Sequence, residues 1–398
     1  MNRLLPLQKR NAVLLRMAEL VRQEESILVS ANGKDLSSFD SDDIAMRDRL
    51  QVDKKKIDEM VASLRQLAVL DDPLDIERFH FNHDNGLKIS NRTVPFGTVL
   101  IIYESRPDVT IEAAGIAFKS GNKILLKGGK ESLNSNLVLV NLWHQALETC
   151  DCSKDWITYL NYSRKETQKF LEKPTEPLDL IVPRGGEKLI SFVKKHASCP
   201  VIVSGRGNNF VYVSQDADLQ MALDIIINAK TTKISACNAV DKVLISRDLP
   251  RKLEFLNLLI QSLKKHGVEI LTDTKLAGLE GTSLMQDTSV WREEFLDYKI
   301  VIGQVPNVAE AVELINTYGG GHSASIITTN EEEANTFMQD VDAAAVYHNA
   351  STRFTDGGQF GLGGELAIST DKLHQRGPIG LQHLVTNKWF IKGTGQVR

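Results

Sequence analysis

Residues 94–127 read VPFGTVLIIYESRPDVTIEAAGIAFKSGNKILLK, and this stretch decides the fold. Val99 to Ile102 and Ile124 to Leu126 are short, continuously apolar runs typical of buried strands. Thr110 to Phe118, between them, has the length and composition of a helix. A strand, a helix and a second strand in this order predict a βαβ unit with parallel strands.

The same alternation continues towards the C-terminus. A helix is expected over 134–147, with strands at Tyr159, 180–182 and 201–203. The pattern restarts after Cys237. Strands are expected at 243–245, 270, 300–302, 325–328 and 344–347, and helices at 252–264, 308–317 and 331–339. Residues 1–70 are amphipathic and helical in pattern. The sequence therefore predicts two successive α/β domains with Cys237 at their junction.

A β-hairpin is predicted upstream of this pattern. Residues 78–82 and 87–91 alternate between polar and apolar, and Asp84, Asn85 and Gly86 are residues that a type I′ turn requires. Because a two-stranded ribbon is marginally stable alone, we expect it to pair with a further strand. A neighbouring subunit is the natural candidate, which makes the hairpin an oligomerisation element.

Composition and charge exclude several classes of protein. The 398 residues are 42% hydrophobic and 25% charged, with a net charge of −4 and no basic tail, so no nucleic-acid partner is expected. No apolar run is long enough to cross a membrane, and the N-terminus has no signal-peptide core. Four cysteines in such a chain predict reduced thiols and a cytoplasmic location. Cys150 and Cys152 form a lone C-x-C, too little for a metal site.

Cys237 is the candidate nucleophile. It lies in KTTKISACNA (230–239), after an amphipathic helical segment and before an apolar strand, and Lys230 and Lys233 flank it. A nearby cation lowers the pKa of a thiol, and the thiolate is the nucleophilic form. The alternative is a buried, inert cysteine.

The chain resembles the aldehyde dehydrogenase superfamily in the order and spacing of several motifs. They are PFGTV (95–99), GNKILLK (121–127), PRGG (183–186), DADL (216–219), Cys237, EF (294–295) and GGQFGLG (357–363). Four further motifs are similar to those of the γ-glutamyl phosphate reductases within that superfamily: YESRPDVT (103–110), YGGGHS (318–323), NASTRFTDGG (349–358) and RGPIGL (376–381).

The resemblance implies a domain organisation and an activity. Residues 1–76 and 95–232 would form a nucleotide-binding domain and 233–365 a catalytic domain with the cysteine loop. Residues 77–94 and 371–398 would be oligomerisation and packing elements. The implied activity is NADPH-dependent reduction of L-glutamyl 5-phosphate to L-glutamate 5-semialdehyde, through a thioester on Cys237, in proline biosynthesis. A homo-oligomer and functional coupling to a glutamate 5-kinase are the implied partners.

The resemblance also assigns residues around the reacting carbonyl. Arg106 and Ser105, where many relatives have an oxyanion-binding Asn, and Asn238 beside the nucleophile are candidates for binding the oxyanion or the phosphate. Counting back from Asp216 places Ser204 where hydrolytic relatives have a general-base Glu. Without that base, the thioester is expected to wait for phosphate rather than water. The alternative for Arg106 is a structural ion pair.

No G-x-G-x-x-G motif follows an early strand, so the nucleotide contacts also come from the resemblance. Lys127 matches a ribose-binding lysine, and Lys130 stands where NAD-preferring relatives have a Glu. Two ammonium groups favour the 2′-phosphate of NADPH. Gly185 and Gly186 precede a helix that would face the pyrophosphate, and Glu294 matches an acidic residue near the nicotinamide ribose.

A last set of residues is expected to bind the amino and carboxylate groups of the substrate. These are His322, Ser323, Ser351, Thr352 and Arg353.

Two other functions compete with the reductase: another acyl-phosphate or acyl-CoA reductase or aldehyde dehydrogenase of the same superfamily, and a catalytically silent oligomeric binding protein. Retention of Cys237, Lys127 and Glu294 together argues against the silent protein.

Overall fold

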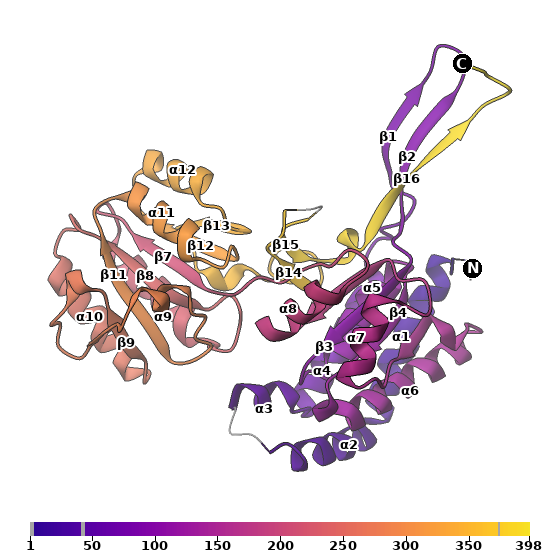
Figure 1. Ribbon diagram of the computed structural model, residues 1–398, viewed down its shortest axis with the longest axis horizontal. Coiled ribbons are helices and arrows are strands. Elements are labelled where there is room, and N and C mark those ends of the chain that lie inside the picture. The colour runs from indigo at the N-terminus through magenta and orange to yellow at the C-terminus, as the bar shows by residue number, and fades with distance from the viewer. Residues whose placement is uncertain (1–3, 41–43, 373–374) are drawn as a thin grey trace. The chain divides into compact units, whose positions relative to one another are not determined.

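The computed structural model describes residues 4–40, 44–372 and 375–398, which divide into two compact units (Figure 1). Unit 1 comprises Met1–Ser204, Gly361–Ala367 and Pro378–Arg398. Unit 2 comprises Gly205–Phe360 and Ile368–Gly377. Each unit contains its own parallel sheet, as predicted.

The boundary between the units differs from the one expected at residue 233. Strand β7 (Asn209–Val213) pairs in parallel with β8 (Val240–Ser246) and β12 (Ser323–Ile327), so it belongs to the sheet of unit 2. The division falls between Ser204 and Gly205. The C-terminal segment expected over 371–398 is also divided, since its first residues belong to unit 2 and those from Pro378 onward to unit 1.

The sheet of unit 1 has four parallel strands in the order β5-β4-β3-β6. The strands are β3 (Thr98–Tyr103), β4 (Lys123–Lys127), β5 (Ile157–Tyr159) and β6 (Leu180–Arg184). The chain adds β4 and β5 on one side of β3 and then places β6 on the other side. Ligands of such sheets bind beyond the carboxyl ends of the strands at this reversal, here between β3 and β6. The strand expected at 201–203 forms only one bridge, from Val201 to Ile181.

Helices cover both faces of this sheet, which explains why its strands are apolar throughout. Val99 and Ile101 pack in the larger core and Leu100 and Ile102 in the smaller one. The helices that contribute to the larger core are α1 (Leu7–Gln23), α2 (Glu25–Ser37), α4 (Lys54–Val69), α5 (Val109–Lys119) and α6 (Leu133–Thr149). The smaller core contains side chains from α7 (Arg164–Glu172) and α8 (Glu187–His196). A short helix, α3 (Ile44–Leu50), precedes α4.

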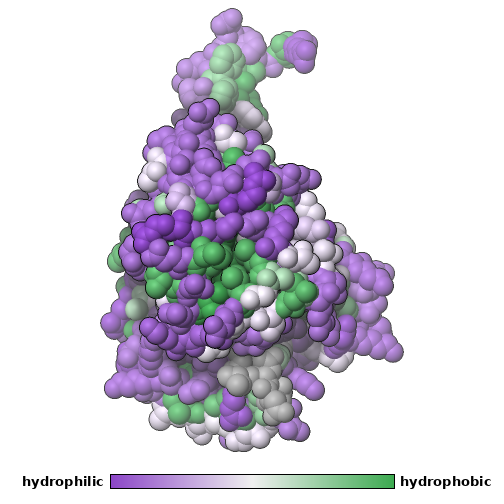
Figure 2. All heavy atoms as spheres, turned by 90° about the vertical axis from the view of Figure 1, so that its left-hand side faces the viewer, coloured by the Kyte–Doolittle hydropathy of each residue, from purple (hydrophilic) through white to green (hydrophobic). Residues whose placement is uncertain are grey.

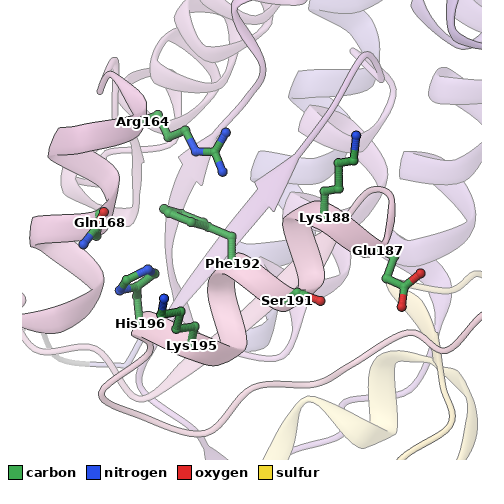
Figure 3. Close-up of a pocket in the computed structure, with 8 residues that line it drawn as sticks. All are labelled: Arg164, Gln168, Glu187, Lys188, Ser191, Phe192, Lys195 and His196. Atoms are coloured by element: carbon green, nitrogen blue, oxygen red, sulfur yellow. The ribbon is translucent and has the colours of Figure 1, made fainter.

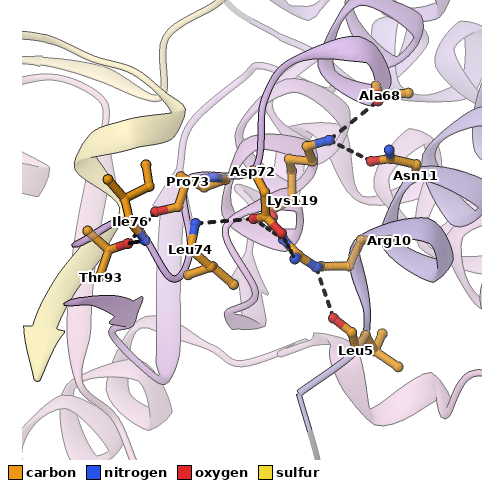
Figure 4. A network of polar contacts seen from close by, with 10 residues as sticks. All are labelled: Leu5, Arg10, Asn11, Ala68, Asp72, Pro73, Leu74, Ile76, Thr93 and Lys119. Atoms are coloured by element: carbon orange, nitrogen blue, oxygen red, sulfur yellow. Dashed lines mark hydrogen bonds and ion pairs between the residues drawn. The ribbon is translucent and has the colours of Figure 1, made fainter. Parts of the chain in front are cut away.

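A buried network of cations holds the helices of unit 1 together (Figure 4). Arg10 donates from Nε to the Leu5 carbonyl (3.0 Å) and from Nη1 to the Lys119 carbonyl, and its Nη2 is 2.6 Å from the Asp72 carboxylate. Lys119 donates to Asn11 (2.5 Å) and to the Ala68 carbonyl (3.3 Å). The two cations therefore satisfy carbonyls at the ends of α4 and α5, which have no partner within their helices.

The predicted hairpin forms an antiparallel sheet that projects from the rest of unit 1 (Figure 1). Strand β1 (Glu77–Asn82) pairs with β2 (Lys88–Pro95), and β16 (Val385–Lys392), which the sequence did not predict, pairs with the other edge of β2. The third strand thus comes from the same chain rather than from a neighbouring subunit. The turn is not type I′, because among its residues only Gly86 has a positive φ (89°).

Apolar side chains of this arm are exposed. Phe79 and Trp389 contact each other edge to face, with ring centroids 5.6 Å apart, yet both remain about half exposed. Figure 2 shows hydrophobic residues among hydrophilic ones on the arm. The exposed large apolar residues of its strands are Phe79, Phe81, Trp389, Phe390 and Ile391.

The sheet of unit 2 has seven strands in the order β10-β9-β11-β8-β7-β12-β13, and every pair is parallel. The strands not yet given are β9 (Glu269–Thr272), β10 (Ser283–Leu284), β11 (Lys299–Val305) and β13 (Ala345–His348). Helices α9 (Leu219–Thr231) and α10 (Lys252–Lys265) pack on one face, and α11 (Val308–Tyr318) and α12 (Glu331–Asp340) on the other. A two-stranded sheet of β14 (Ala367–Ser369) and β15 (Gly377–Ile379) completes the fold.

Among the described residues, none of the helices combines the length and the apolar character needed to cross a bilayer.

We predict that Arg10→Met lowers the free energy of unfolding by about 2 to 4 kcal/mol, because it removes charge-assisted bonds from buried acceptors. Chemical denaturation of the full chain measures this change. The matched control is Arg247→Met, which removes an exposed pair with Asp248 and should leave the denaturation curve unchanged. Equal effects of the two substitutions would contradict the structural role of Arg10.

Candidate active site

Cys237 lies on a loop between the end of α9 and the start of β8, and its side chain is half-buried. The buried side-chain amide of Asn209 holds this loop, since its Nδ2 is 2.7 Å from the Cys237 carbonyl and 2.6 Å from that of Ala239. Gly207 packs against the same backbone, and a Cβ there would lie 2.0 Å from the Cys237 carbonyl oxygen. The structure thus fixes the backbone of the nucleophile while leaving its thiol accessible.

A turn that includes Arg353 is bonded to the cysteine loop through Asn238. The side chain of Asn238 donates to the carbonyls of Arg353 (3.2 Å) and Thr355 (2.9 Å), and the Thr352 hydroxyl donates to the Asn238 carbonyl (2.8 Å). Both hydrogens of the Asn238 amide are therefore engaged within the protein. Its side chain does not offer the oxyanion a donor in this structure, in contrast to the prediction.

The guanidinium of Arg353 interacts electrostatically with Cys237. Burial lowers the pKa of Arg353, and the negative charges of Cys237 and Asp356 oppose that shift. The lysines named from the sequence have other surroundings: Lys230 is fully buried and pairs with Asp241 at 2.8 Å, and Lys233 is exposed. Of the two lysines that flank Cys237 in the sequence, Lys230 is thus engaged elsewhere.

The other residues expected to bind substrate form bonds within unit 2. His322 Nδ1 lies 2.8 Å from the Ser323 hydroxyl, which is 2.7 Å from the Thr355 hydroxyl. Burial lowers the pKa of His322 to about 4, so its ring is neutral. Ser351 donates to the Asn228 side chain (2.8 Å). Together with Thr352, these side chains support the Arg353 turn from within the protein.

Glu294 lies between two anchored residues. Lys242 is fully buried and donates to the Glu293 carbonyl (2.8 Å), and its ammonium is 3.8 Å from the centre of the Phe295 ring. The Asp241 carboxylate accepts from the Phe295 backbone N–H (2.8 Å). Burial lowers the pKa of Lys242 to about 7. These contacts set the position of the Glu294 backbone, and no local pattern in the sequence indicates them.

In unit 1, the residues expected to bind the nucleotide lie beyond the carboxyl ends of β4 and β6. Lys127 ends β4 and donates to the Gly128 carbonyl (2.6 Å), and burial lowers its pKa. Lys130 is exposed. Gly186 caps α8, and its N–H donates to the Glu104 carboxylate (3.0 Å) from the end of β3. This helix N-terminus therefore already has an anionic partner.

Ser105 and Arg106 follow Glu104 and are bonded to acidic side chains. The Ser105 backbone N–H and hydroxyl both donate to Glu131 (2.7 and 2.9 Å), and Ser105 has a positive φ of 44°. Arg106 Nη2 is 2.9 Å from Asp108. Although burial alone would raise the pKa of Asp108, the Arg106 guanidinium lowers it. The structural ion pair that the sequence analysis named as the alternative role of Arg106 is thus present.

A pocket between α7 and α8 contains basic residues that the sequence analysis missed (Figure 3). Arg164 lies over the Phe192 ring, 5.2 Å from its centre, and Lys188 and Lys195 line the same pocket. The signal was present in the sequence, because residues 188, 191, 192 and 195 have the spacing of one helical face. A flat ring with nearby cations suits a phosphorylated aromatic ligand.

A second pocket lies at the edge of the unit 2 sheet where β7 and β12 begin. It is lined by Gly205, Arg206, Arg292, Tyr318, Gly319 and Gly320. Arg292 stacks over the Tyr318 ring at 4.8 Å, and Arg206 donates to the Arg292 carbonyl (3.3 Å). The charged side chains that line this pocket are both arginines.

We predict that Cys237 is the thiol that iodoacetamide modifies first at pH 7.5. Burial raises the pKa of Cys150 and Cys152 and raises that of Cys199 to about 11, so these three thiols are protonated. Peptide mass spectrometry of the briefly treated native chain measures the order, with urea-unfolded chain as the control for intrinsic reactivity. Earlier modification of any of the other three would contradict the assignment.

We also predict that wild type gains stability relative to Lys242→Met when the pH rises from 7 to 9. An unfolded lysine keeps its proton over this range, whereas folded Lys242, with a pKa of about 7, loses it. The unfolded state then binds more protons, so the difference in unfolding free energy should increase by roughly 1 to 3 kcal/mol. Urea denaturation at both pH values measures it, and a constant difference would show that Lys242 does not titrate here.

The chain is similar to a known protein family over nearly its whole length. The model of the Aldehyde dehydrogenase family matches residues 2–278 and 281–389. The gamma-glutamyl phosphate reductase of Clostridium botulinum (strain Alaska E43 / Type E3) is 40% identical over 392 residues, which are 98% of this chain and 94% of that protein. The one of Nautilia profundicola is 42% identical over 390 residues, covering 97% and 94%.

A solved structure agrees with the sequence comparisons. The crystal structure of gamma-glutamyl phosphate reductase from Thermotoga maritima has a TM-score of 0.92 and 39% identity, and the match covers 99% of this chain and 95% of that one. The predicted fold and family are confirmed, and the family implies a nicotinamide cofactor. The chain therefore belongs to the aldehyde dehydrogenase family and, within it, to the γ-glutamyl phosphate reductases, which are oxidoreductases acting on the aldehyde group.

Proposed function

We propose that this chain reduces L-glutamyl 5-phosphate to L-glutamate 5-semialdehyde and phosphate with NADPH, as the second step of proline biosynthesis from glutamate. The observation that carries the proposal is the accessible Cys237 thiol on a fixed loop beside the Arg353 guanidinium. A thiolate needs both accessibility and a neighbouring positive charge to act as a nucleophile.

Cys237 carries the covalent steps. Its Sγ attacks the carbonyl carbon of the acyl phosphate, the bond from that carbon to the phosphate oxygen breaks, and the electron pair leaves with phosphate. A thioester on Cys237 results. Once the thioester carbonyl is reduced, the carbon–sulfur bond of the thiohemiacetal breaks, which returns the thiolate and frees the aldehyde. The backbone N–H of Cys237 and a neighbouring donor are the proposed ligands of the oxyanion.

The nicotinamide supplies the hydride when it is bound. Lys127 and Lys130 are proposed to face the 2′-phosphate, and the pocket of Arg164, Lys188 and Phe192 has the charge and the ring that an adenosine phosphate requires. Glu294 is proposed to bind the nicotinamide ribose. The Gly185–Gly186 turn is open to a pyrophosphate only when the Glu104 carboxylate moves away, because a Cβ at Gly185 would lie 2.2 Å from that carboxylate.

Arg106 remains a proposed phosphate ligand, at the expense of its pair with Asp108. Ser204 stands where hydrolytic relatives have their base, so the thioester is proposed to react with phosphate and not with water. We further propose that the chain forms a homo-oligomer through the apolar arm of β1, β2 and β16, and that it works with a glutamate 5-kinase that supplies the acyl phosphate.

The reverse reaction tests the proposed function. Purified protein with pyrroline-5-carboxylate, which is in equilibrium with glutamate 5-semialdehyde, should form NADPH continuously from NADP⁺ when phosphate is present and stop after about one turnover without it. NAD⁺ should be the poorer cofactor. Cys237→Ala should lose about 10³-fold or more of the rate and still bind NADP⁺.

Absorbance at 340 nm measures the rate, and quenching of protein fluorescence measures cofactor binding. Steady NADPH formation in phosphate-free buffer would indicate a hydrolytic aldehyde dehydrogenase. Substantial turnover by Cys237→Ala would exclude the thioester.

A further inference from the structure

The Arg353 guanidinium has buried donor atoms without acceptors. Within the described residues, its Nε and Nη1 are inaccessible to solvent and form no hydrogen bond. Asp356, the nearest acidic residue in sequence, uses its Oδ1 to accept from the backbone N–H groups of Gly358 and Gln359. Buried polar groups of native proteins are nearly always paired, so two buried donors without acceptors on one cation call for an explanation.

The backbone that carries this guanidinium is held in place. Arg353 lies in a short 3-10 turn (Thr352–Phe354) whose carbonyls accept from Asn238, the residue after the nucleophile. The Thr352 hydroxyl returns a bond to the Asn238 carbonyl. Because the turn and the cysteine loop are bonded in both directions, the backbone of Arg353 cannot move away without breaking these bonds. A ligand at the site could then supply the missing acceptors.

We propose that Arg353 binds the phosphoryl group of the acyl phosphate, and that this group supplies the acceptors that its Nε and Nη1 lack. The proposal rests on the proposed function and deepens it. The phosphoryl group is joined through one oxygen to the carbon that Cys237 attacks, whereas the α-carboxylate stands at the far end of the glutamyl chain. A cation that interacts with the sulfur therefore reaches the phosphoryl group more readily than the α-carboxylate.

This contact accounts for both charges that form at the site. Before the substrate binds, the guanidinium faces the thiolate and stabilises it. When Sγ attacks and the carbon–oxygen bond breaks, the electron pair and the new negative charge pass to the departing phosphate, which the fork of the guanidinium can bind through two N–H groups. Release of phosphate then leaves Arg353 for the thiolate of the next cycle. Arg106 would contribute to this step only by giving up its pair with Asp108.

Alkylation of Cys237 by iodoacetamide tests the proposal on the full chain without turnover. The rate is measured by peptide mass spectrometry with and without inorganic phosphate, at an ionic strength held constant with chloride, and in a parallel series with L-glutamate. In wild type, phosphate should slow alkylation several-fold by occupying Arg353. L-glutamate, which offers a carboxylate without a phosphoryl group, should have little effect.

Two substitutions of Arg353 and one control complete the design. Arg353→Met should alkylate about threefold to tenfold more slowly without phosphate, because the thiolate loses its cation, and should not respond to phosphate. Arg353→Lys keeps the charge and should keep part of the response. Arg292→Met, in the second basic pocket of the same unit, should behave like wild type. Circular dichroism checks that each variant is folded.

A phosphate response that persists in Arg353→Met, or one that disappears in Arg292→Met, would overturn the proposal. So would slowing by L-glutamate alone, which would assign Arg353 to the α-carboxylate. These outcomes are independent of the proposed function, because alkylation requires neither cofactor nor reduction. A chain that reduces glutamyl phosphate but shows no Arg353-dependent phosphate effect would keep its function and lose this site.

Discussion

The side-chain amide of Asn209 is the contact on which the geometry of the active site depends. Its Nδ2 lies within hydrogen-bonding distance of the carbonyls of Gly207, Cys237 and Ala239, and the residue is completely buried. Asn209 is also the first residue of β7, next to the middle of its sheet. The loop of the nucleophile is thereby bonded to an inner strand of the unit 2 sheet. A loop held only by its own turns would leave the direction of the thiol undetermined.

The candidate residues lie at opposite ends of the strands in the two parallel sheets. In unit 1 the residues proposed for the cofactor follow the carboxyl ends of strands, as at Lys127 and Gly186. In unit 2 the loop of Cys237 precedes β8, and His322 precedes β12, so the site lies at the amino edge of that sheet. Each sheet is covered by helices on both faces. Loops are then left only at the ends of the strands. This explains why most candidate residues lie in loops and short turns.

The sequence predicted what depends on local pattern. Alternation of apolar runs and helical segments located most strands of both sheets, although not β7 or β10, because a strand buried on both faces is apolar along its whole length. It did not predict β16, whose residues are mostly exposed and become a strand only through pairing with β2, about 300 residues earlier. It also missed β7, and the boundary expected at residue 233 placed the residues of that strand in the other domain.

The candidate site likewise combines features that a local pattern predicts with features that it does not. A thiol on a polar loop and a glycine turn before a helix are local features, and the positions of Cys237 and Gly186 were predicted correctly as a loop and a helix start. The charge beside the thiol was not. Lys230 is seven residues from Cys237, but as part of the last turn of α9 it directs its ammonium to Asp241, whereas Arg353 reaches the thiol from a turn 116 residues further along. Such neighbours are fixed by tertiary contacts that sequence spacing does not encode.

The polar residues behind Arg353 explain how an unpaired guanidinium can persist there. His322, Ser323, Thr355 and the partly exposed Tyr347 form a chain in which each hydroxyl is 2.7 or 2.8 Å from its neighbour. Burial keeps His322 neutral by lowering its pKa to about 4, so the chain adds no charge that would compete with the arginine. The hydrogen bonds of this chain favour a single arrangement of the turn above it. The folding energy of unit 2 thus maintains the position of a cation that gains its full set of partners only when an anion binds.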